Sequence, residues 1–200
     1  MVVNYFWNMA LADALLCPLG TVEIMLRNAV HNTLSAFFGR ADWYDGRGLL
    51  EEKQETQVAE AKGHIASRNK PVTPERVVSN LTFGFWVTLL SGNYNDRLWR
   101  PNMSSNLRAA FPHTPKNKRQ RGDIQAKYYR ALSLRNLAFH HEPILDLQTL
   151  LDDHRRAYDG IAWIDPSMVA KTRLFDRFPD TFQHGRSAVE AKVMTHLGFD

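Results

Sequence analysis

The sequence predicts an all-α protein, and three observations support that prediction. Apolar residues recur at intervals of three and four along most of the chain, the spacing that places them on one face of a helix. Helix start and stop signals, prolines and glycines above all, bound these segments. The alternation and regularly spaced turns of a β protein are missing from the sequence. With 200 residues, 44% of them hydrophobic, we expect one helical bundle with additional C-terminal helices.

The first third of the chain predicts three helices. The first covers residues 3–16, because Pro18 should terminate it. The second begins near Thr21, a good capping residue, and extends to Phe38. A third, over residues 49–67, is charged with sparse apolar spacing, so we expect it to be largely exposed.

The middle of the chain predicts a long buried helix and a short one. Thr73 and Pro74 form a helix start, with a capping threonine and a proline at the first helical position. Residues 77–90 are almost continuously apolar; run length alone would allow a strand, but the cap and the length favour a buried helix. A helix-sized segment follows at residues 104–111.

A long helix then leads to the most functionally dense stretch of the chain. Tyr128, Leu132 and Phe139 fall at helical spacing. Pro143 limits the helix because the residue before a proline is pushed out of the α region. We therefore expect this helix to end or kink near Glu142.

The C-terminal part predicts further helices. Pro143 should open one that runs to about Tyr158, and Asp165 should cap the first of two short helices at residues 167–177 and 186–196. We divide the chain into a helical domain, residues 1–158, and a C-terminal extension, residues 159–200. Four apolar residues are expected to dock the extension on the domain: Trp163, Leu174, Phe175 and Phe178.

Composition limits the function classes. The net charge of +4 and the sequence pI near 9.3 are compatible with nucleic acid. The single cysteine, Cys17, excludes an internal disulfide and fits a reducing cytoplasm; a small buried apolar role suits it best. We expect no signal peptide and no membrane span, because Asp13 and Pro18 interrupt the apolar segment near the start.

Residues 133–143 contain the densest group of side chains that could take part in catalysis or binding: an arginine, an asparagine, two histidines and a glutamate. On a helix, Asn136 and His140 share one face, and Arg135 lies roughly 140° from His140. A histidine exchanges protons near neutral pH, and an arginine holds a phosphate with two parallel hydrogen bonds. Together they suit phosphodiester cleavage by a ribose 2′-OH without a metal ion.

This stretch resembles a known family. Arg135-Asn136-x-x-x-His140 is similar to the arginine-polar-histidine signature of the HEPN ribonucleases. Its extension through His141-Glu142-Pro143 resembles the Abi-like (abortive infection) branch of that superfamily. The resemblance covers roughly residues 5–150, fades after that, and is carried in the same order by four further motifs: Tyr5-x-Trp7-Asn8, Glu23-x-x-Leu26-Arg27-Asn28, Phe83-Gly84-Phe85-Trp86 and Asn95-Asp96-Arg97-Leu98-Trp99.

The resemblance implies a HEPN-like bundle and a metal-independent endoribonuclease. His140 would be the general base or acid, Arg135 would hold the scissile phosphate, and Asn136 would orient His140 or the ribose. His141 is a candidate for the second proton transfer, and spacing leaves open which histidine is primary. The resemblance also implies a homodimer with the site between two motif helices, and a role in phage defence or as a toxin restrained by an antitoxin protein.

Two further groups are candidates for contact with RNA. The strongest basic cluster directly precedes the motif helix and contains Lys116, Lys118, Arg119 and Arg121. Arg27 and Asn28 belong to a face with Glu23 and His31 that is either a second polar patch beside the His140 site or a solvated face with a salt bridge. The triplet Asn95-Asp96-Arg97 favours loop capping over substrate contact.

Other chemistries have weaker support. The sequence has no P-loop, dinucleotide-binding glycine pattern or nucleophile elbow, so we expect no cofactor. Adjacent histidines on a helix point about 100° apart and rarely chelate one ion, so we assign no metal. The histidine pair could also be purely structural, with one ring at the negative helix end. The alternative is therefore a non-catalytic helical protein that binds RNA or has a regulatory function.

Overall fold

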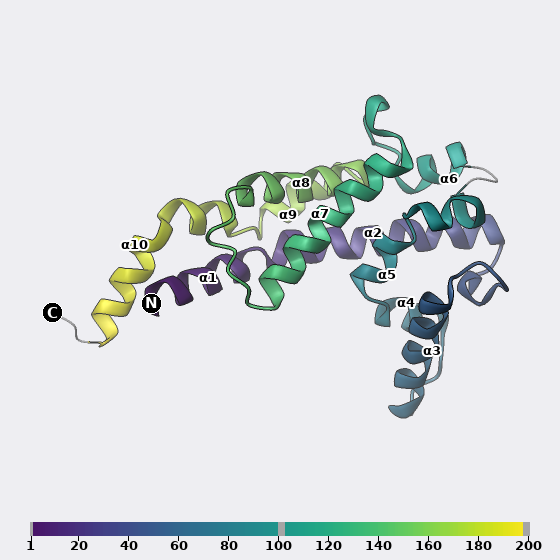
Figure 1. Ribbon diagram of the computed structural model, residues 1–200, viewed down its shortest axis with the longest axis horizontal. Coiled ribbons are helices and arrows are strands. Elements are labelled where there is room, and N and C mark those ends of the chain that lie inside the picture. Colours follow the sequence, from purple (N-terminus) through teal and green to yellow (C-terminus); the bar gives the residue numbers. More distant parts are fainter. Residues whose placement is uncertain (1, 100–102, 198–200) are drawn as a thin grey trace.

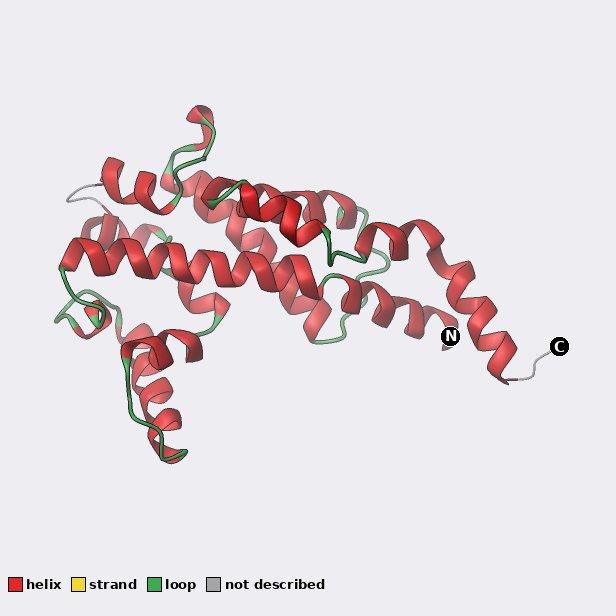
Figure 2. Ribbon diagram, turned by 180° about the vertical axis from the view of Figure 1, so that it is seen from behind, coloured by secondary structure: helices red, strands yellow, loops and turns green. Residues whose placement is uncertain are grey.

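The computed structural model describes residues 2–99 and 103–197, and within these ranges it contains helices and turns but no strand (Figures 1 and 2). The predicted all-α class is confirmed. The molecule is elongated, with one long helical rod along its length and the other helices packed on or projecting from it.

The rod consists of α1 (Val2–Ala14) and α2 (Leu16–Phe38), separated only by Leu15 (Figure 1). The predicted stop at Pro18 is wrong, because Pro18 lies in the first turn of α2. The N–H that a proline lacks has no intrahelical partner at such a position. Thr21 does not cap α2 either; its hydroxyl donates to the Cys17 carbonyl at 2.8 Å from within the helix.

Taken as one helix, Val2–Phe38 is long and apolar enough to cross a membrane by length and composition alone. The prediction of no such segment rested on Asp13 and Pro18 interrupting it. Core helices of globular proteins pass the same test. Leu19, Val22 and Leu26 are fully buried within the bundle, and 39% of the most apolar window of the helix is buried.

The helix that carries the motif, α7 (Arg121–Phe139), packs with α8 (Leu150–Ile164) against the rod (Figure 1). The Tyr128 hydroxyl donates to the Gly160 carbonyl at 2.9 Å. A Cβ at Gly160 would come within 3.2 Å of Val22, so the close approach of α8 to α2 requires a glycine.

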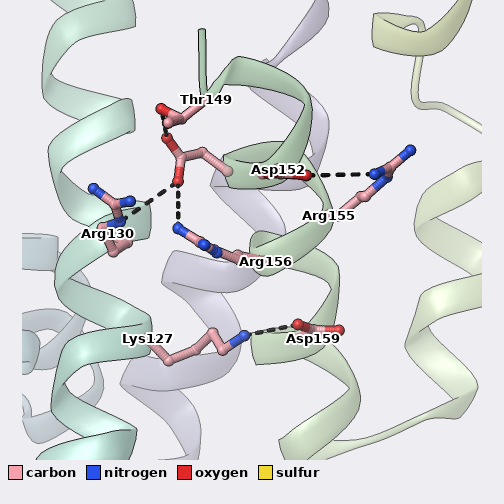
Figure 3. Close-up of polar contacts among 8 residues, drawn as sticks. Lys127, Arg130, Thr149, Asp152, Arg155, Arg156 and Asp159 are labelled. Carbon is pink, nitrogen blue, oxygen red and sulfur yellow. Dashed lines mark hydrogen bonds and ion pairs between the residues drawn. The ribbon is translucent and has the colours of Figure 1, made fainter. Parts of the chain in front are cut away.

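Ion pairs hold the outer faces of α7 and α8 together (Figure 3). Lys127 Nζ lies 2.7 Å from Asp159 Oδ2, and Arg130 Nε lies 3.6 Å from Asp153 Oδ1. Arg156 approaches the same Asp153 carboxylate from within α8. Partly exposed pairs each contribute about 1 kcal/mol or less, so their main effect is to set the register of the two helices.

A side arm of α3 (Glu52–Ser67) and α4 (Pro74–Asn80) projects from the rod, and α5 (Phe83–Thr88) packs against α2 and α7 at its base (Figures 1 and 2). The exposed α3 and the start of α4 at Pro74 agree with the predictions. The single helix predicted over residues 77–90 is wrong, since Thr82 caps a new helix by accepting from the Phe85 N–H at 3.2 Å.

Short elements then lead to the start of α7. Turns over Gly92–Tyr94 and Asn95–Trp99 are followed by α6 (Met103–Ala110), close to its predicted bounds. The Asn95 side chain donates to the Asp96 carboxylate at 3.4 Å within the same short segment. The basic cluster forms a 3₁₀ turn, Lys116–Lys118, directly before α7.

The C-terminal part differs from the prediction at its start. Pro143 does not open a helix; residues 140–149 are turns and irregular chain, and α8 begins at Leu150. The expected boundary between residues 158 and 159 falls inside α8.

Two helices form the tail, α9 (Ser167–Arg173) and α10 (Phe178–Leu197), and Gly185 interrupts α10 with a φ of 64°. Of the four expected anchors, Trp163 and Phe178 are buried. Leu174 and Phe175 are exposed, so that part of the docking prediction is wrong.

A buried carboxylate joins the tail to α8. Asp176, in the turn between α9 and α10, accepts from the Tyr158 hydroxyl and His154 Nε2, each at 2.7 Å, and from the Phe178 N–H at 3.0 Å. Burial raises the pKa of Tyr158, and the hydrogen bond to Asp176 and its charge raise it as well. The Asp176 side chain is 2% exposed, so these bonds are shielded from water.

Replacing Asp176 with alanine is expected to lower the free energy of unfolding by about 3–5 kcal/mol, because His154 and Tyr158 would keep buried polar groups without their acceptor. For a chain of this size the melting temperature should fall by on the order of 10 °C. Thermal unfolding followed by circular dichroism measures this. Asp180→Ala, an exposed position in the first turn of α10, is the matched control. Equal melting of the two variants would contradict a joining role for the Asp176 network.

Candidate functional site

The motif residues lie where α7 ends, and the helix ends earlier than predicted. Its last residue is Phe139, and His140 follows as the C-terminal cap, with its N–H donating to the Asn136 carbonyl at 2.9 Å. The Glu142 N–H then donates a hydrogen bond to the Leu137 carbonyl at 3.0 Å. This is the bond of a Schellman motif, which reverses the chain before Pro143 is reached.

His141 occupies the left-handed position of this motif, with a φ of 58°. Glycine is usual there because a side chain is strained in that conformation by about 1–2 kcal/mol. Strain held at a polar residue is a common feature of functional sites. The two adjacent histidines consequently leave the helix end in different backbone conformations.

Asn8 of α1 holds the loop that follows the motif. Its side chain donates to the Glu142 carbonyl at 3.1 Å and accepts from the N–H groups of Ile144 at 2.7 Å and Leu145 at 3.2 Å. Asn8 is buried. This positioning role was not predicted, although Asn8 belongs to the first of the motifs that carry the family resemblance.

Arg135 lies between α7 and α2. Its Nε is 3.5 Å from Glu23 Oε2, and its guanidinium carbon lies 4.7 Å from the centre of the Phe139 ring. The side chain is 31% exposed, while Nε is buried without a hydrogen-bond partner. Glu23 and Phe139 therefore fix the stem of the guanidinium, and within the described chain its terminal amino groups have no partner.

Asn136, His140 and His141 are exposed. Within residues 2–99 and 103–197, none of their side chains makes a hydrogen bond or ion pair. These three polar groups are thus available to a ligand.

A shallow apolar groove adjoins His141. It has a volume of about 260 Å³ and runs between the α1–α2 junction and the end of α7. Met9, Leu16 and Phe139 line it and are 37–44% exposed. We call this surface the His141 groove. An apolar surface beside unpaired polar groups is typical of a contact site.

Of the second predicted patch, Glu23 is the residue that contacts the motif, through its ion pair with Arg135. Arg27 donates to its neighbour Asn28 at 3.3 Å, while Glu23 pairs with Arg135 rather than with Arg27. His31 accepts from the Trp43 indole N–H at 3.2 Å, and burial lowers its pKa. Residues spaced four apart on one helix thus contact three different parts of the molecule.

The predicted basic cluster lies at the opposite end of α7 from the motif. The helix has 19 residues, so about 28 Å separates its two ends. Lys116 and Lys118 are exposed, and Arg119 and Arg121 are half-buried. These four residues cannot touch the phosphate that Arg135 would hold in the same chain.

Within the described ranges, histidine, cysteine and carboxylate side chains form no group of three or more with the placement of metal ligands. Comparison of the chain with models of known protein families, with curated proteins and with solved structures finds no match.

Proposed function

We propose that this chain is a metal-independent endoribonuclease of the HEPN type, similar to its Abi-like branch. The observation that carries the proposal is the end of α7, where His140, His141 and Asn136 are exposed and unpaired beside the partly exposed Arg135. Residues with a purely structural role would instead be buried and hydrogen-bonded within the chain.

The proposed reaction uses two proton transfers. His140 accepts the proton of a ribose 2′-OH while the 2′ oxygen attacks the adjacent phosphorus. His141 donates a proton to the 5′ oxygen as the P–O5′ bond breaks. The products are a 2′,3′-cyclic phosphate and a 5′-hydroxyl end. Arg135 stabilises the charge on the phosphate oxygens, and Asn136 orients His140 or the ribose.

A second copy of the chain completes the proposed site. Arg135 and His140 lie five residues apart along α7, about 7.5 Å in rise and roughly 140° in direction. The exposed side chains of the His141 groove, with Tyr5 one turn earlier, offer a largely apolar face next to the motif on which a second copy can pack. Two motif ends meeting across that face would place two copies of each group in one cleft.

We propose a cytoplasmic role in phage defence or as a toxin restrained by an antitoxin protein. Unrestrained RNA cleavage would harm the host cell, so such an enzyme needs control. A partner that covers the His141 groove would prevent dimer formation and silence the site.

One observation favours the alternative of a non-catalytic RNA-binding or regulatory protein. The ion pair of Arg135 with Glu23 and its contact with Phe139 are the contacts of a residue that joins two helices. Purified protein incubated with total cellular RNA in excess EDTA tests between the two functions. The ribonuclease cleaves the RNA under these conditions. RNA binding without cleavage, by protein of intact helical content, would favour the alternative.

His141→Gly separates strain from function. Glycine accepts the left-handed conformation, so the variant should be more stable by about 1 kcal/mol and melt about 2–4 °C higher. Without the second proton transfer, cleavage should fall by at least about 10²-fold. Thermal unfolding and an RNA cleavage assay on the same preparation measure both effects. A variant that is more stable and fully active would remove His141 from the mechanism.

A further inference from the structure

A second site lies at the far end of the motif helix. A cavity of about 430 Å³ opens between α6, the loop that follows it and the first turn of α7. Arg108, Arg119 and Arg121 line it, each from a different one of these segments. No aspartate or glutamate is among the lining residues. We call this cavity the arginine pocket.

Two of the three guanidinium groups are held in place without being neutralised, and the third, that of Arg108, is exposed. Arg119 Nε donates to the Thr114 carbonyl at 3.0 Å. Arg121 Nη1 donates to the Leu90 carbonyl and, at 3.0 Å, to the Gln125 side chain. Within the described part of the chain, none of the three pairs with a carboxylate. Neutral acceptors thus orient Arg119 and Arg121 and leave their charge for a ligand.

The first turn of α7 adds backbone donors to the same cavity. Gln120, the residue before the helix, provides no side-chain cap, so the first N–H groups of a 19-residue helix are not satisfied by it. A Cβ built at Gly122 would meet no atom within 4 Å, so the backbone there is open to an approaching ligand. A helix N-terminus of this kind favours an anion.

A buried hydroxyl in the pocket lining lacks a partner. Thr114 is 1% exposed, and its Oγ1 makes no hydrogen bond. Buried hydroxyl groups are rarely left unpaired. Other atoms cover this oxygen in the unliganded chain, so a ligand oxygen accepts from it only where binding displaces them.

We infer that the arginine pocket binds the phosphate monoester of a nucleotide. A monoester carries about two negative charges near neutral pH, against one for a backbone diester, and the pocket offers three unpaired cations. The inference rests on the proposed function in one respect, that nucleotides are the ligands of this protein. About 28 Å separates the pocket from the motif, so the pocket anchors a phosphate that is not the one cleaved. The monoester is the 5′ end of an RNA or a free nucleotide.

Binding to the intact chain carrying His140→Ala tests this without cleavage. A short RNA labelled at its 3′ end is compared with and without a 5′-phosphate by fluorescence anisotropy at one fixed salt concentration. The 5′-phosphorylated RNA is expected to bind at least about tenfold more tightly. Arg108→Gln, at an exposed side chain, should abolish that preference, and Arg186→Gln, an exposed arginine on α10, should preserve it.

A second variant guards against an effect on folding. Thr114→Val removes the unpaired hydroxyl and keeps the shape of the side chain. The variant should be at least as stable as the parent and should show a several-fold weaker preference for the 5′-phosphate.

The remaining outcomes separate the ligand sources and the two proposals. Equal binding of the two RNAs, with a free nucleoside monophosphate bound by the parent and lost in Arg108→Gln, assigns the pocket to a free nucleotide. No phosphate-dependent binding in either assay overturns the inference, even if the unmodified protein cleaves RNA in EDTA. Phosphate-dependent binding without such cleavage keeps the pocket and removes the proposed ribonuclease.

Discussion

Replacing His140 with alanine is expected to lower the rate of RNA cleavage by about 10²–10⁴-fold, the usual contribution of a general base or acid. The fold should be unaffected, because the His140 ring is exposed and has no partner within the described chain. Exposed substitutions of this kind change the free energy of unfolding by about 0.5 kcal/mol or less. A loss of activity would therefore report on chemistry and not on folding.

Single-turnover cleavage of a defined RNA in excess EDTA measures the effect. His196→Ala, another exposed histidine near the end of α10, is the matched control and should cleave at the rate of the parent. Equal rates for the parent and both variants would assign the cleavage to a contaminant or to a different site, and His140 would leave the mechanism.

Leu16→Glu is expected to convert a dimer into monomers and to reduce cleavage in parallel. Leu16 lies in the His141 groove and is 44% exposed in one chain. Across the proposed interface the new carboxylate would be buried without a partner, which costs several kcal/mol; each 1.4 kcal/mol is a factor of ten. We expect the dimer to weaken by at least about 10²-fold. The single chain should tolerate the change, since the Leu16 side chain is 44% exposed there.

Light scattering and cleavage over one range of protein concentrations measure both effects. Leu174→Glu makes the same chemical change at a residue that is 79% exposed directly after α9 and should leave both properties unchanged. A monomeric parent that cleaves RNA would contradict the shared site. A Leu16→Glu variant that stays dimeric would place the interface on another surface.

The sequence predicts the helical class because apolar residues recur at helical spacing along most of the chain. The errors lie where one local signal decided a boundary. Pro18 was taken as a helix stop, yet in the first turn of α2 it costs no hydrogen bond. Thr82 was hidden in a continuous apolar run, yet its hydroxyl caps α5. Local propensity alone cannot tell whether a helix ends or continues at such a residue, because packing against neighbouring helices determines the outcome.

Only the part of the candidate site that is contiguous in sequence could be predicted. Residues 135–141 stay together because they share one helix end. The contact of Arg135 with Glu23 depends on the packing of α7 against α2, and helical spacing favoured Arg27 as the partner of Glu23 instead. Asn8 reaches the same loop from the start of the chain. Spacing could not have linked these groups.

Closeness in sequence does not place the basic cluster beside the motif. The cluster immediately precedes the motif helix, and the sequence makes it a candidate for contact with RNA. A helix of 19 residues carries the two groups to opposite ends. The same geometry creates the arginine pocket, whose members Arg108 and Thr114 lie outside the basic run.

The chemistry of the RNA ends tests the central proposal most directly. RNA cleaved by the purified protein in excess EDTA should carry 2′,3′-cyclic phosphate and 5′-hydroxyl ends, and these ends should be missing after incubation with His140→Ala. Such products follow from attack by the ribose 2′-OH, with His140 as a proton carrier. Ends with a 5′-phosphate and a 3′-hydroxyl, formed only when a divalent metal ion is supplied, would contradict the proposed mechanism.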